Sequence, residues 1–348
     1  MIFKIISEKS DWDNKISTLD ISEIYFTFEY CKAVEKIEQG EAKLAIFENI
    51  SGEIVYPFIL RRINYHDKKT DFFDIITPYG YGGPYIKGEI ANNLKIFRKI
   101  FEIYCQEQNI VTEVIRFHPL MNNHIPMQRY MDLAYIRKTT AVNLENDIDT
   151  IRSKYSTMNK RNIKKARKNG VFCVAVEKNE VNINIFIELY SETMKRNNAL
   201  EFYYFNNEII ADMLKDTKKS SSHLLFAFYE GRVVSAVILY HCGEVSHYHL
   251  GASKTQYLHL KSNNILFDYM ICYSKQKNSK IIHLGGGYSE NDGLFSFKSS
   301  FSNNNHFEYF LGKKIVNDEI YEKLNENLSD NNNLNGSYFP RYRAITKN

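Results

Sequence analysis

The sequence predicts an α+β fold built from two similar modules, and three observations lead to this prediction. The chain has 348 residues, which is longer than one hydrophobic core usually supports, so two domains are expected. Hydrophobic residues make up 44% of it and include 25 Tyr and 23 Phe, a composition that fills cores and excludes disordered or collagen-like proteins. Each half of the chain also alternates β-type runs with helical ones, which is typical of sheets covered by helices.

The first half is expected to hold a hairpin, a helix and a further strand. The hairpin is predicted because two apolar runs flank the turn signal Ser51-Gly52. The helix is predicted from apolar side chains at spacings of three and four, after asparagines that can cap its first turn. In chain order, the segments are the strands 44–49 and 53–63, the helix 94–109 with the caps Asn92 and Asn93, and the strand 111–120.

The second half is expected to open with a long helical stretch, residues 147–168, that ends at the stop signal Asn169-Gly170. Its strongest signal is a run of three strands within residues 223–253, because the turn pairs Glu230-Gly231 and Gly243-Glu244 divide that run. The remaining expected elements are a strand over 171–176, a helix over 182–196, a helix over 264–277 and a strand over 280–286.

The alternation of elements also suggests where the domains meet. We expect a first domain over residues 1–147 and a second over 148–317, with the tail 318–348 packing back on the first. Within that tail, the Asn- and Asp-rich residues 325–335 predict a loop or a frayed helix end, and only residues 339–343 are expected to be anchored.

Charge, cysteines and the length of the apolar runs indicate in which compartment of the cell the protein is expected. Lys and Arg exceed Asp and Glu by 45 − 41, a formal net charge of +4. Apolar runs such as 233–240 are shorter than the about 20 residues of a spanning helix, and Lys4 and Glu8 interrupt any signal peptide. The five cysteines are odd in number and scattered, which favours reduced thiols over disulfides or a zinc site. We expect a cytoplasmic protein without a transmembrane segment, in peripheral contact with the inner face of the plasma membrane, and with no bound metal.

Residues 77–85, with the sequence TPYGYGGPY, form a loop rich in glycine and tyrosine. Glycines permit a tight turn with close backbone approach, and tyrosines supply both a flat ring and a hydroxyl group. The loop is therefore either a structured turn with packed rings or one wall of a substrate cleft, in which case Tyr79, Tyr81 and Gly83 would contact substrate.

The stretch 283–302 carries the most specific motif. A predicted strand runs directly into Gly285, Gly286 and Gly287, whose backbone amides could hold an acyl or phosphoryl oxygen. The stretch has neither the lysine of a P-loop nor the spacing of a dinucleotide fingerprint, which disfavours nucleotide hydrolysis. Lys298 lies among phenylalanines, where a partly desolvated ammonium could stabilise an oxyanion or simply extend past its apolar neighbours.

Residues 156–170 concentrate positive charge on one predicted helix. A cationic stripe on a helix suits the phosphates of a nucleotide sugar, an RNA or a lipid headgroup, although a solvated helix face has the same composition. The candidate phosphate- or RNA-binding residues are Lys160, Arg161, Lys164, Lys165 and Lys168.

Several of these segments together resemble the Fem-type aminoacyltransferases, a family of tandem acetyltransferase-like (GNAT) domains that add amino acids to peptidoglycan precursors. The matching segments are the basic helix 159–171, the strand end 248–253, the glycine turn with the LFSFKSSFS segment after it, and FPRYR at 339–343. The loop TPYGYGGP resembles members found among bacterial surface-polysaccharide genes. The resemblance covers essentially the whole chain and implies two tandem GNAT domains without the inserted coiled-coil arm, as in the compact FemX-like form.

The resemblance also implies roles for particular residues. The family's Phe-Lys pair falls on Phe297 and Lys298, and the lysine would polarise the acyl carbonyl or stabilise the oxyanion. Arg196 and Tyr204 lie where the family contacts the phosphates of its precursor. A substrate cleft between the modules would receive Tyr81 and the turn 82–84 from the first module, and Tyr248 with Gly285, Gly286 and Gly287 from the second.

The chain differs from its relatives at two places. The peptidoglycan enzymes carry Arg-Gly-Pro with an acidic residue three positions after the proline, whereas this chain has Gly82 and Lys87 at those positions. GNAT enzymes carry a glycine-rich loop for the coenzyme A pyrophosphate, whereas residues 251–264 here hold no closely spaced glycines.

These observations predict an acyltransferase that moves an aminoacyl group from aminoacyl-tRNA to an amine of a nucleotide- or lipid-linked cell-wall or surface-glycan precursor. It would hold no bound cofactor, and aminoacyl-tRNA or acyl-CoA would be its co-substrate. Two alternatives stay open. One is an acyl-CoA-dependent N-acyltransferase of an amino sugar, and the other is a non-enzymatic module that binds phosphoglycan or RNA through the basic helix.

Overall fold

The computed structural model describes residues 1–65, 68–326 and 338–344, and the chain divides into two compact units. The first unit comprises residues 1–18, 34–136 and 309–348, and the second comprises residues 19–33 and 137–308. The changes of unit therefore fall at 136/137 and 308/309 rather than at 147/148 and 317/318, and the segment 19–33 belongs to the second unit. The sequence could not mark these changes, because they fall inside the strands β7 (Asp132–Asn143) and β13 (His306–Ile315), where no turn signal occurs.

The first unit is a twisted sheet with helices packed on it. Its strands follow the order β1-β2-β3-β4-β6-β13, with β5 paired to β3. All neighbours in this order are antiparallel except β4 and β6, which are parallel. Its further elements are β1 (Ile2–Ile6), α1 (Lys9–Ser17), α3 (Glu35–Glu38), β2 (Glu41–Asn49), β3 (Gly52–Tyr65), β4 (Lys68–Ile76), β5 (Tyr85–Gly88), α4 (Ala91–Glu107), β6 (Ile110–Arg116), α5 (His124–Met127), α12 (Asp318–Asn325) and the 3₁₀ turn η4 (Arg341–Arg343).

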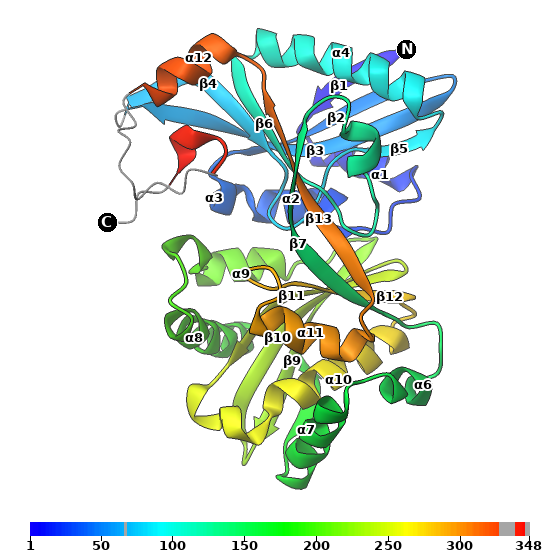
Figure 1. Cartoon of the computed structure of the whole chain (residues 1–348), viewed down its shortest axis with the longest axis vertical. Helices are drawn as coiled ribbons and strands as arrows, with labels where there is room; N and C mark the ends of the chain where they lie inside the picture. The colour runs from blue at the N-terminus through cyan, green and yellow to red at the C-terminus, as the bar shows by residue number, and fades with distance from the viewer. Residues whose placement is uncertain (66–67, 327–337, 345–348) are drawn as a thin grey trace. The chain divides into compact units, whose positions relative to one another are not determined.

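The core of the first unit lies between its sheet and α4, the long helix drawn in cyan in Figure 1. The rings of Phe97 and Phe101 stack on this helix with centroids 5.4 Å apart, and Phe101 also packs against Tyr56 and Phe58 of β3. These positions follow the spacing of three and four that predicted the helix. Helix α12 packs on β6, and its Tyr321 and Leu324 lie with Ile63 of β3 in a second, smaller cluster.

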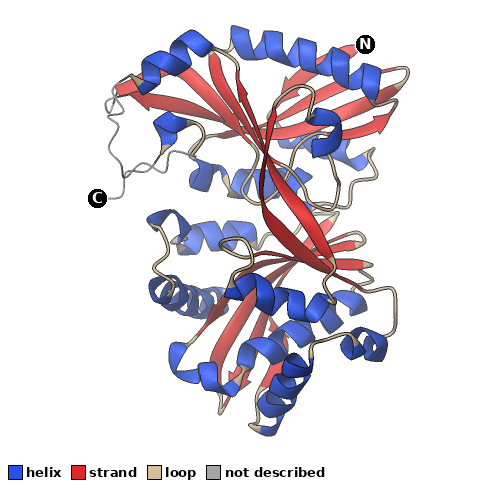
Figure 2. Cartoon of the chain, viewed as in Figure 1, coloured by secondary structure: helices blue, strands red, loops and turns tan. Residues whose placement is uncertain are grey.

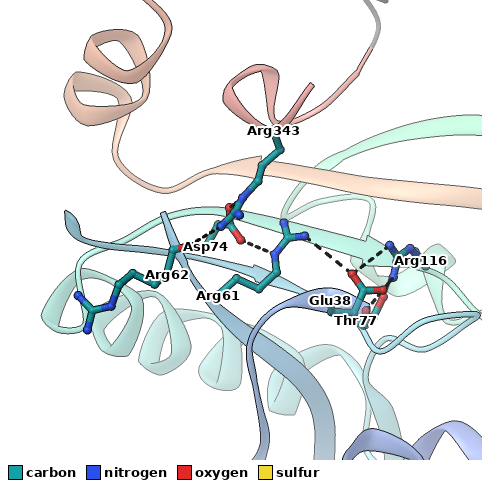
Figure 3. Close-up of polar contacts among 7 residues, drawn as sticks. All are labelled: Glu38, Arg61, Arg62, Asp74, Thr77, Arg116 and Arg343. Atoms are coloured by element: carbon teal, nitrogen blue, oxygen red, sulfur yellow. Dashed lines mark hydrogen bonds and ion pairs between the residues drawn. The ribbon is translucent and has the colours of Figure 1, made fainter. Parts of the chain in front are cut away.

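Buried charges in the first unit are paired with one another. Asp74 on β4 is fully buried and accepts hydrogen bonds from Arg61 Nε at 2.6 Å and from Arg343 Nε at 2.8 Å. The carboxylate of Glu38 accepts from Arg116 Nη1 at 2.6 Å and lies 3.8 Å from Arg61 Nη1, so the five side chains form one network (Figure 3). Through Arg343, the network anchors the FPRYR segment at the end of the described chain.

The second unit repeats the plan of the first. Its strands follow the order β7-β12-β11-β10-β9-β8, antiparallel throughout except for the parallel pair β11 and β12. Its further elements are η1 (Ile24–Phe26), α2 (Phe28–Ala33), α6 (Ile148–Ser153), α7 (Thr157–Lys168), β8 (Phe172–Val176), α8 (Glu180–Arg196), η2 (Glu201–Tyr203), α9 (Asn207–Met213), β9 (Ser220–Tyr229), β10 (Arg232–Cys242), β11 (Val245–Ser253), η3 (Thr255–Leu260), α10 (Ser262–Gln276), β12 (Ile281–Gly286) and α11 (Gly293–Ser302).

Both units therefore contain four antiparallel strands, then a helix, then a strand parallel to the fourth. In the first unit this series is β1-β2-β3-β4-α4-β6, and in the second it is β8-β9-β10-β11-α10-β12. Figure 2 shows the strands of each unit in red and the helices that cover them in blue. In the second unit, α10 packs on β9 and β10 while α8 packs on β10 and β11. Consecutive residues of β10, 234–240, are all buried, so both faces of this strand are covered.

The structure confirms most of the expected elements and corrects two details. The predicted hairpin is β2 and β3, and the three predicted strands of 223–253 are β9, β10 and β11. The asparagine caps of α4 were wrong: the helix begins at Ala91, and the Glu89 carboxylate accepts from the amides of Asn92 and Asn93.

The stretch 147–168 is two helices rather than one. Asp147 caps α6 by accepting from Thr150 N, and Ser156 caps α7 by accepting from Asn159 N. The break between the two helices was missed because Ser156, which starts the second helix, lies within a continuous polar stretch.

The other expectations on the chain's character concern thiols, membrane spans and the tail. All five cysteines are free, and three of them are buried. Among the described residues, no helix combines the length and the apolar character needed to cross a membrane. The loop expected over 325–335 falls almost wholly outside the described residues.

Candidate acyl-transfer site

The second unit contains a point at which two parallel strands separate. Strands β11 and β12 pair over three residues only, from Val245 with Ile281 to His247 with His283. Beyond this point β11 continues beside β10, with a register shift between Ile238 and Leu239, and β12 continues beside β7. The strands therefore part after His247, and the backbone beyond that residue has no β11–β12 ladder in the described chain.

Lys298 lies where the strands part. Its Nζ donates a hydrogen bond of 2.8 Å to the carbonyl oxygen of Gly286, the last residue of β12. The same nitrogen lies 4.7 Å from the ring centroid of Tyr248 on β11, within reach of a cation–π interaction. The ammonium thus contacts both strands, and only 5% of the residue is exposed to solvent.

Helix α11 brings Lys298 to this position. The Asp292 carboxylate caps the helix by accepting from Phe295 N at 2.7 Å. Phe297 and Phe301 of α11 pack against Phe267 of α10, with ring centroids 4.9 Å and 5.4 Å apart, and Phe267 also contacts Tyr248 at 5.0 Å. The aromatic contacts fix the rotation of α11, so Lys298 points toward the strands.

Burial lowers the pKa of Lys298 to about 7, because an ammonium loses its hydration there. The nearby Asp292 carboxylate raises this pKa in part, and the Arg137 guanidinium lowers it further. Within the described residues Lys298 forms no ion pair, so no carboxylate neutralises it. A buried amine that titrates near neutral pH and faces a strand opening is typical of a functional site.

The glycine turn after β12 is held by two charged side chains. Arg137 Nη1 donates to the carbonyl oxygens of Gly287 at 2.7 Å and Tyr288 at 2.6 Å. Asp292 accepts from the amides of Tyr288 at 2.5 Å and Ser289 at 2.9 Å. A Cβ on Gly287 would lie 2.0 Å from Asp292 Oδ1, so this position requires glycine. Arg137 and Asp292 therefore hold the turn that directly follows Gly286, whose carbonyl oxygen binds Lys298.

The three predicted glycines of this turn do not share one environment. Gly285 and Gly286 belong to β12 and pair with Thr140 and Thr139 of β7, and only Gly287 lies beyond the strand. The loop amides that point inward, those of Tyr288 and Ser289, already donate to Asp292. The carbonyl partner of the lysine comes from Gly286, the last residue of β12.

Arg196 and Tyr204 lie apart from Lys298. Arg196 Nη1 donates to Ser253 O at 3.0 Å and to Thr255 Oγ1 at 2.9 Å, at the far end of β11. Tyr204 follows η2 and is 39% exposed. Neither side chain contacts Lys298 in the described part of the chain.

The tyrosine and glycine loop belongs to the first unit. Tyr81 packs edge-on against His118 at 5.7 Å and Tyr309 at 5.4 Å, while Tyr79 is half-buried. Gly83 has φ +96°, and a Cβ there would meet Asn123 Nδ2 at 2.8 Å. The loop is thus a packed turn, and Tyr79 and Tyr81 are partly exposed.

The basic helix forms as predicted. Asn159, Ile163 and Ala166 are its buried residues, and they face the unit's core. The five predicted cations, Lys160, Arg161, Lys164, Lys165 and Lys168, are all exposed on α7.

Sequence reasoning missed the role of Arg137. Arg137 acts on carbonyls about 150 positions further along the chain. No local pattern could indicate such contacts. Aspartate is a typical N-cap residue, so Asp292 before an apolar segment was a signal that could have identified the start of α11.

Three comparisons relate the chain to known proteins. Residues 153–298, less than half of the chain, match the acetyltransferase (GNAT) domain family, and the matched segment ends at Lys298. No curated protein matches the chain significantly. Among solved structures, FemX is similar with a TM-score of 0.69 and 13% identity, over 93% of this chain and 99% of that one.

Two further solved structures share the fold. L-PGS from Bacillus licheniformis has a TM-score of 0.57 and 10% identity, over 88% of this chain and 92% of that one. The C-terminal (DUF2156) domain of a candidate lysylphosphatidylglycerol synthetase from Agrobacterium fabrum has a TM-score of 0.53 and 11% identity, over 88% of this chain and 90% of that one.

The fold and the matched domain define the chain as an acyltransferase with tandem GNAT-like units. Within that class it has the fold of FemX, so the predicted α+β architecture and the resemblance to the Fem-type family are confirmed, the latter at the level of fold.

Proposed function

We propose that the chain transfers an aminoacyl group from the ester of an aminoacyl-tRNA to an amine of a cell-wall or surface-glycan precursor. The observation that carries the proposal is the position of Lys298, a buried amine held by Gly286 O where β11 and β12 part. An acyl carbonyl that enters between the two strands would place its oxygen beside this nitrogen.

The chemistry needs few groups from the protein. The neutral acceptor amine attacks the ester carbonyl carbon, and a C–N bond forms as the carbonyl oxygen takes up negative charge. The ammonium of Lys298 stabilises that oxygen, and burial strengthens the interaction because little water competes. The ester C–O bond then breaks, and the amine proton passes to the departing hydroxyl oxygen. Positioning supplies much of the remaining rate, since the ester is already activated.

The solved relatives favour an aminoacyl donor. The name lysylphosphatidylglycerol synthetase describes a protein that joins a lysyl group to a lipid, and FemX shares the fold over nearly its whole length. We propose a nucleotide- or lipid-linked precursor as the acceptor, met at the cytoplasmic face of the membrane. Tyr79, Tyr81, Gly83, Arg196 and Tyr204 are the residues proposed to contact it.

A second candidate is an acyl-CoA-dependent N-acyltransferase of an amino sugar. The matched domain family is described as an acetyltransferase, which favours a thioester donor. The same lysine would serve a thioester carbonyl equally well, so the site alone does not choose between the donors.

Two measurements test the proposal. Purified chain is incubated with aminoacyl-tRNA or acetyl-CoA and candidate precursors, and calorimetry measures acetyl-CoA binding. Mass spectrometry then compares precursors from cells with and without the gene. A missing aminoacyl mass supports the proposal, whereas a missing acetyl mass together with acetyl-CoA binding supports the second candidate.

A further inference from the structure

A pocket of about 260 Å³ lies beside α7 in the second unit, away from the parted strands. We call it the α7 pocket. Its walls combine cations with apolar side chains, a composition suited to an anion that carries an organic group. The charged lining residues are Arg152, Lys160, Lys164, Arg167 and Asp268, and the others are Tyr155 and Ile163.

The α7 pocket has a large excess of positive charge. Asp268 is 98% buried and is shared by two guanidinium groups, Arg152 through Nε and Nη2 and Arg167 through Nη2, all at 2.8 Å. Four cations against one carboxylate leave 4 − 1 = 3 positive charges. Within the described residues, Lys164 forms no hydrogen bond or ion pair through its side chain. A phosphate group would supply the missing negative charge and accept hydrogen bonds from several of these donors.

Packing connects the α7 pocket to the site at Lys298. Asp268 directly follows Phe267, whose ring contacts both Tyr248 and Phe297. Tyr155 of the pocket wall contacts Phe301, which lies one turn after Phe297 on α11. The pocket and the site therefore share helix α10, and the contact of Tyr155 with Phe301 links the pocket wall to α11.

The segment that holds pyrophosphate in GNAT enzymes has a different form here. Residues 255–260 form the 3₁₀ turn η3, and Lys261 at φ +61° leads into α10 without closely spaced glycines. The phosphates of an acyl donor thus need another partner. We propose that the α7 pocket binds a phosphate group of the acyl donor, a proposal that rests on the acyl-transfer function of the Lys298 site. Acyl-CoA and aminoacyl-tRNA both carry phosphate esters, so the pocket fits either donor.

The binding experiment uses inorganic pyrophosphate, which tests the pocket without catalysis. Calorimetry measures its affinity for the full chain, for Lys164→Glu, and for Lys218→Glu as a control with the same charge change at an exposed lysine between α9 and β9. Lys164→Glu is expected to weaken binding about tenfold, the loss expected for one charge-assisted hydrogen bond. Lys218→Glu should change it less than about twofold, because that charge is screened from the pocket.

Two outcomes overturn the proposal: no pyrophosphate binding by the full chain, or equal weakening by Lys164→Glu and Lys218→Glu. Steady-state kinetics then identify the donor, because Lys164→Glu should raise the KM for the true donor, aminoacyl-tRNA or acyl-CoA, and leave kcat unchanged. Lys298→Met separates the two proposals. It should lower kcat about 100-fold without changing pyrophosphate affinity, so a failure of the Lys298 function leaves the pocket measurement interpretable.

Discussion

The two units share a topology and use the same place in it differently. In the second unit, β11 and β12 part after His247, and Lys298 contacts both strands there. In the first unit, β4 and β6 part after Ile76 and Val114, and the chain's own loop occupies the space beside β6. Gly82 N donates to Arg116 O at 2.7 Å, and His118 N donates to Gly82 O at 3.1 Å. In the first unit, the loop forms the hydrogen bonds that the β4–β6 ladder no longer makes. In the second unit, the buried Lys298 lies at the corresponding place.

Buried Lys298 of the second unit differs from the paired buried charges of the first unit and from the paired Asp268 of its own unit. In the first unit, Arg98 and Arg61 each contact a buried carboxylate, and Figure 3 shows the larger of these networks. In the second unit, the partners of Lys298 are a carbonyl oxygen and an aromatic ring. A buried charge that contacts an opposite charge recovers part of the free energy lost on leaving water. A buried cation without a carboxylate partner recovers less, so it lowers the free energy of unfolding. We infer that the paired charges stabilise the first unit and that the unpaired lysine is kept for function.

The largest expected effect is on the stability of the first unit. Arg98→Met leaves the fully buried Glu113, which now accepts bonds of 2.9 and 2.6 Å from Arg98, without its partner. The free energy of unfolding should fall by about 3–5 kcal/mol, measured by urea denaturation. The double variant Arg98→Met with Glu113→Leu should recover most of that loss. If the double variant is as unstable as the single one, the pair is not the cause.

Replacing Lys298 should lower activity and leave stability unharmed, the reverse of the effect expected for Arg98. Lys298→Met removes the cation and keeps an unbranched apolar chain, so kcat should fall by about 100-fold, as for the loss of one oxyanion partner. The free energy of unfolding should stay the same or rise, because a buried ammonium has been removed. Lys218→Met is the matched control and should change neither quantity. Full activity in Lys298→Met would contradict the assigned role.

The fold was largely predictable, and the site only in part. The meander 223–253 could be predicted because its turns are local, and the burial of Lys298 could be predicted because its aromatic neighbours are close in sequence. Arg137 could not be predicted, since its partners Gly287 and Tyr288 are about 150 residues away. The place of the segment 19–33 in the second unit could not be predicted either, because its contacts are also distant in sequence. One of them joins Glu23 to His247 at 2.6 Å.

A smaller stability effect tests the loop that closes the first unit. Gly83→Ala forces a side chain onto a residue with φ +96° and places its Cβ 2.8 Å from Asn123 Nδ2. We expect a loss of about 2 kcal/mol in urea denaturation. Gly293→Ala is the control in the second unit, because Gly293 starts α11 and a Cβ there meets nothing within 4 Å. It should be neutral or stabilising by a few tenths of a kcal/mol. Equal losses at both glycines would contradict the distinction.

The smallest expected effect concerns pH, and it asks whether Lys298 acts as an ammonium. If the charged form is required, kcat/KM should fall as pH rises through about 7, the pKa to which burial lowers this lysine. Asp292 raises that pKa and Arg137 lowers it. Asp292→Asn keeps one oxygen that can cap the helix but loses the charge and the second oxygen, which accepts from the amides of Tyr288 and Ser289. The falling limb should therefore move to lower pH, and the lost contacts to the turn lower kcat at every pH. Arg137→Gln should move the limb to higher pH, although the lost contacts to the turn lower kcat at every pH. Shifts in opposite directions would separate an electrostatic effect on Lys298 from simple damage to the loop, which would lower both curves without moving either limb.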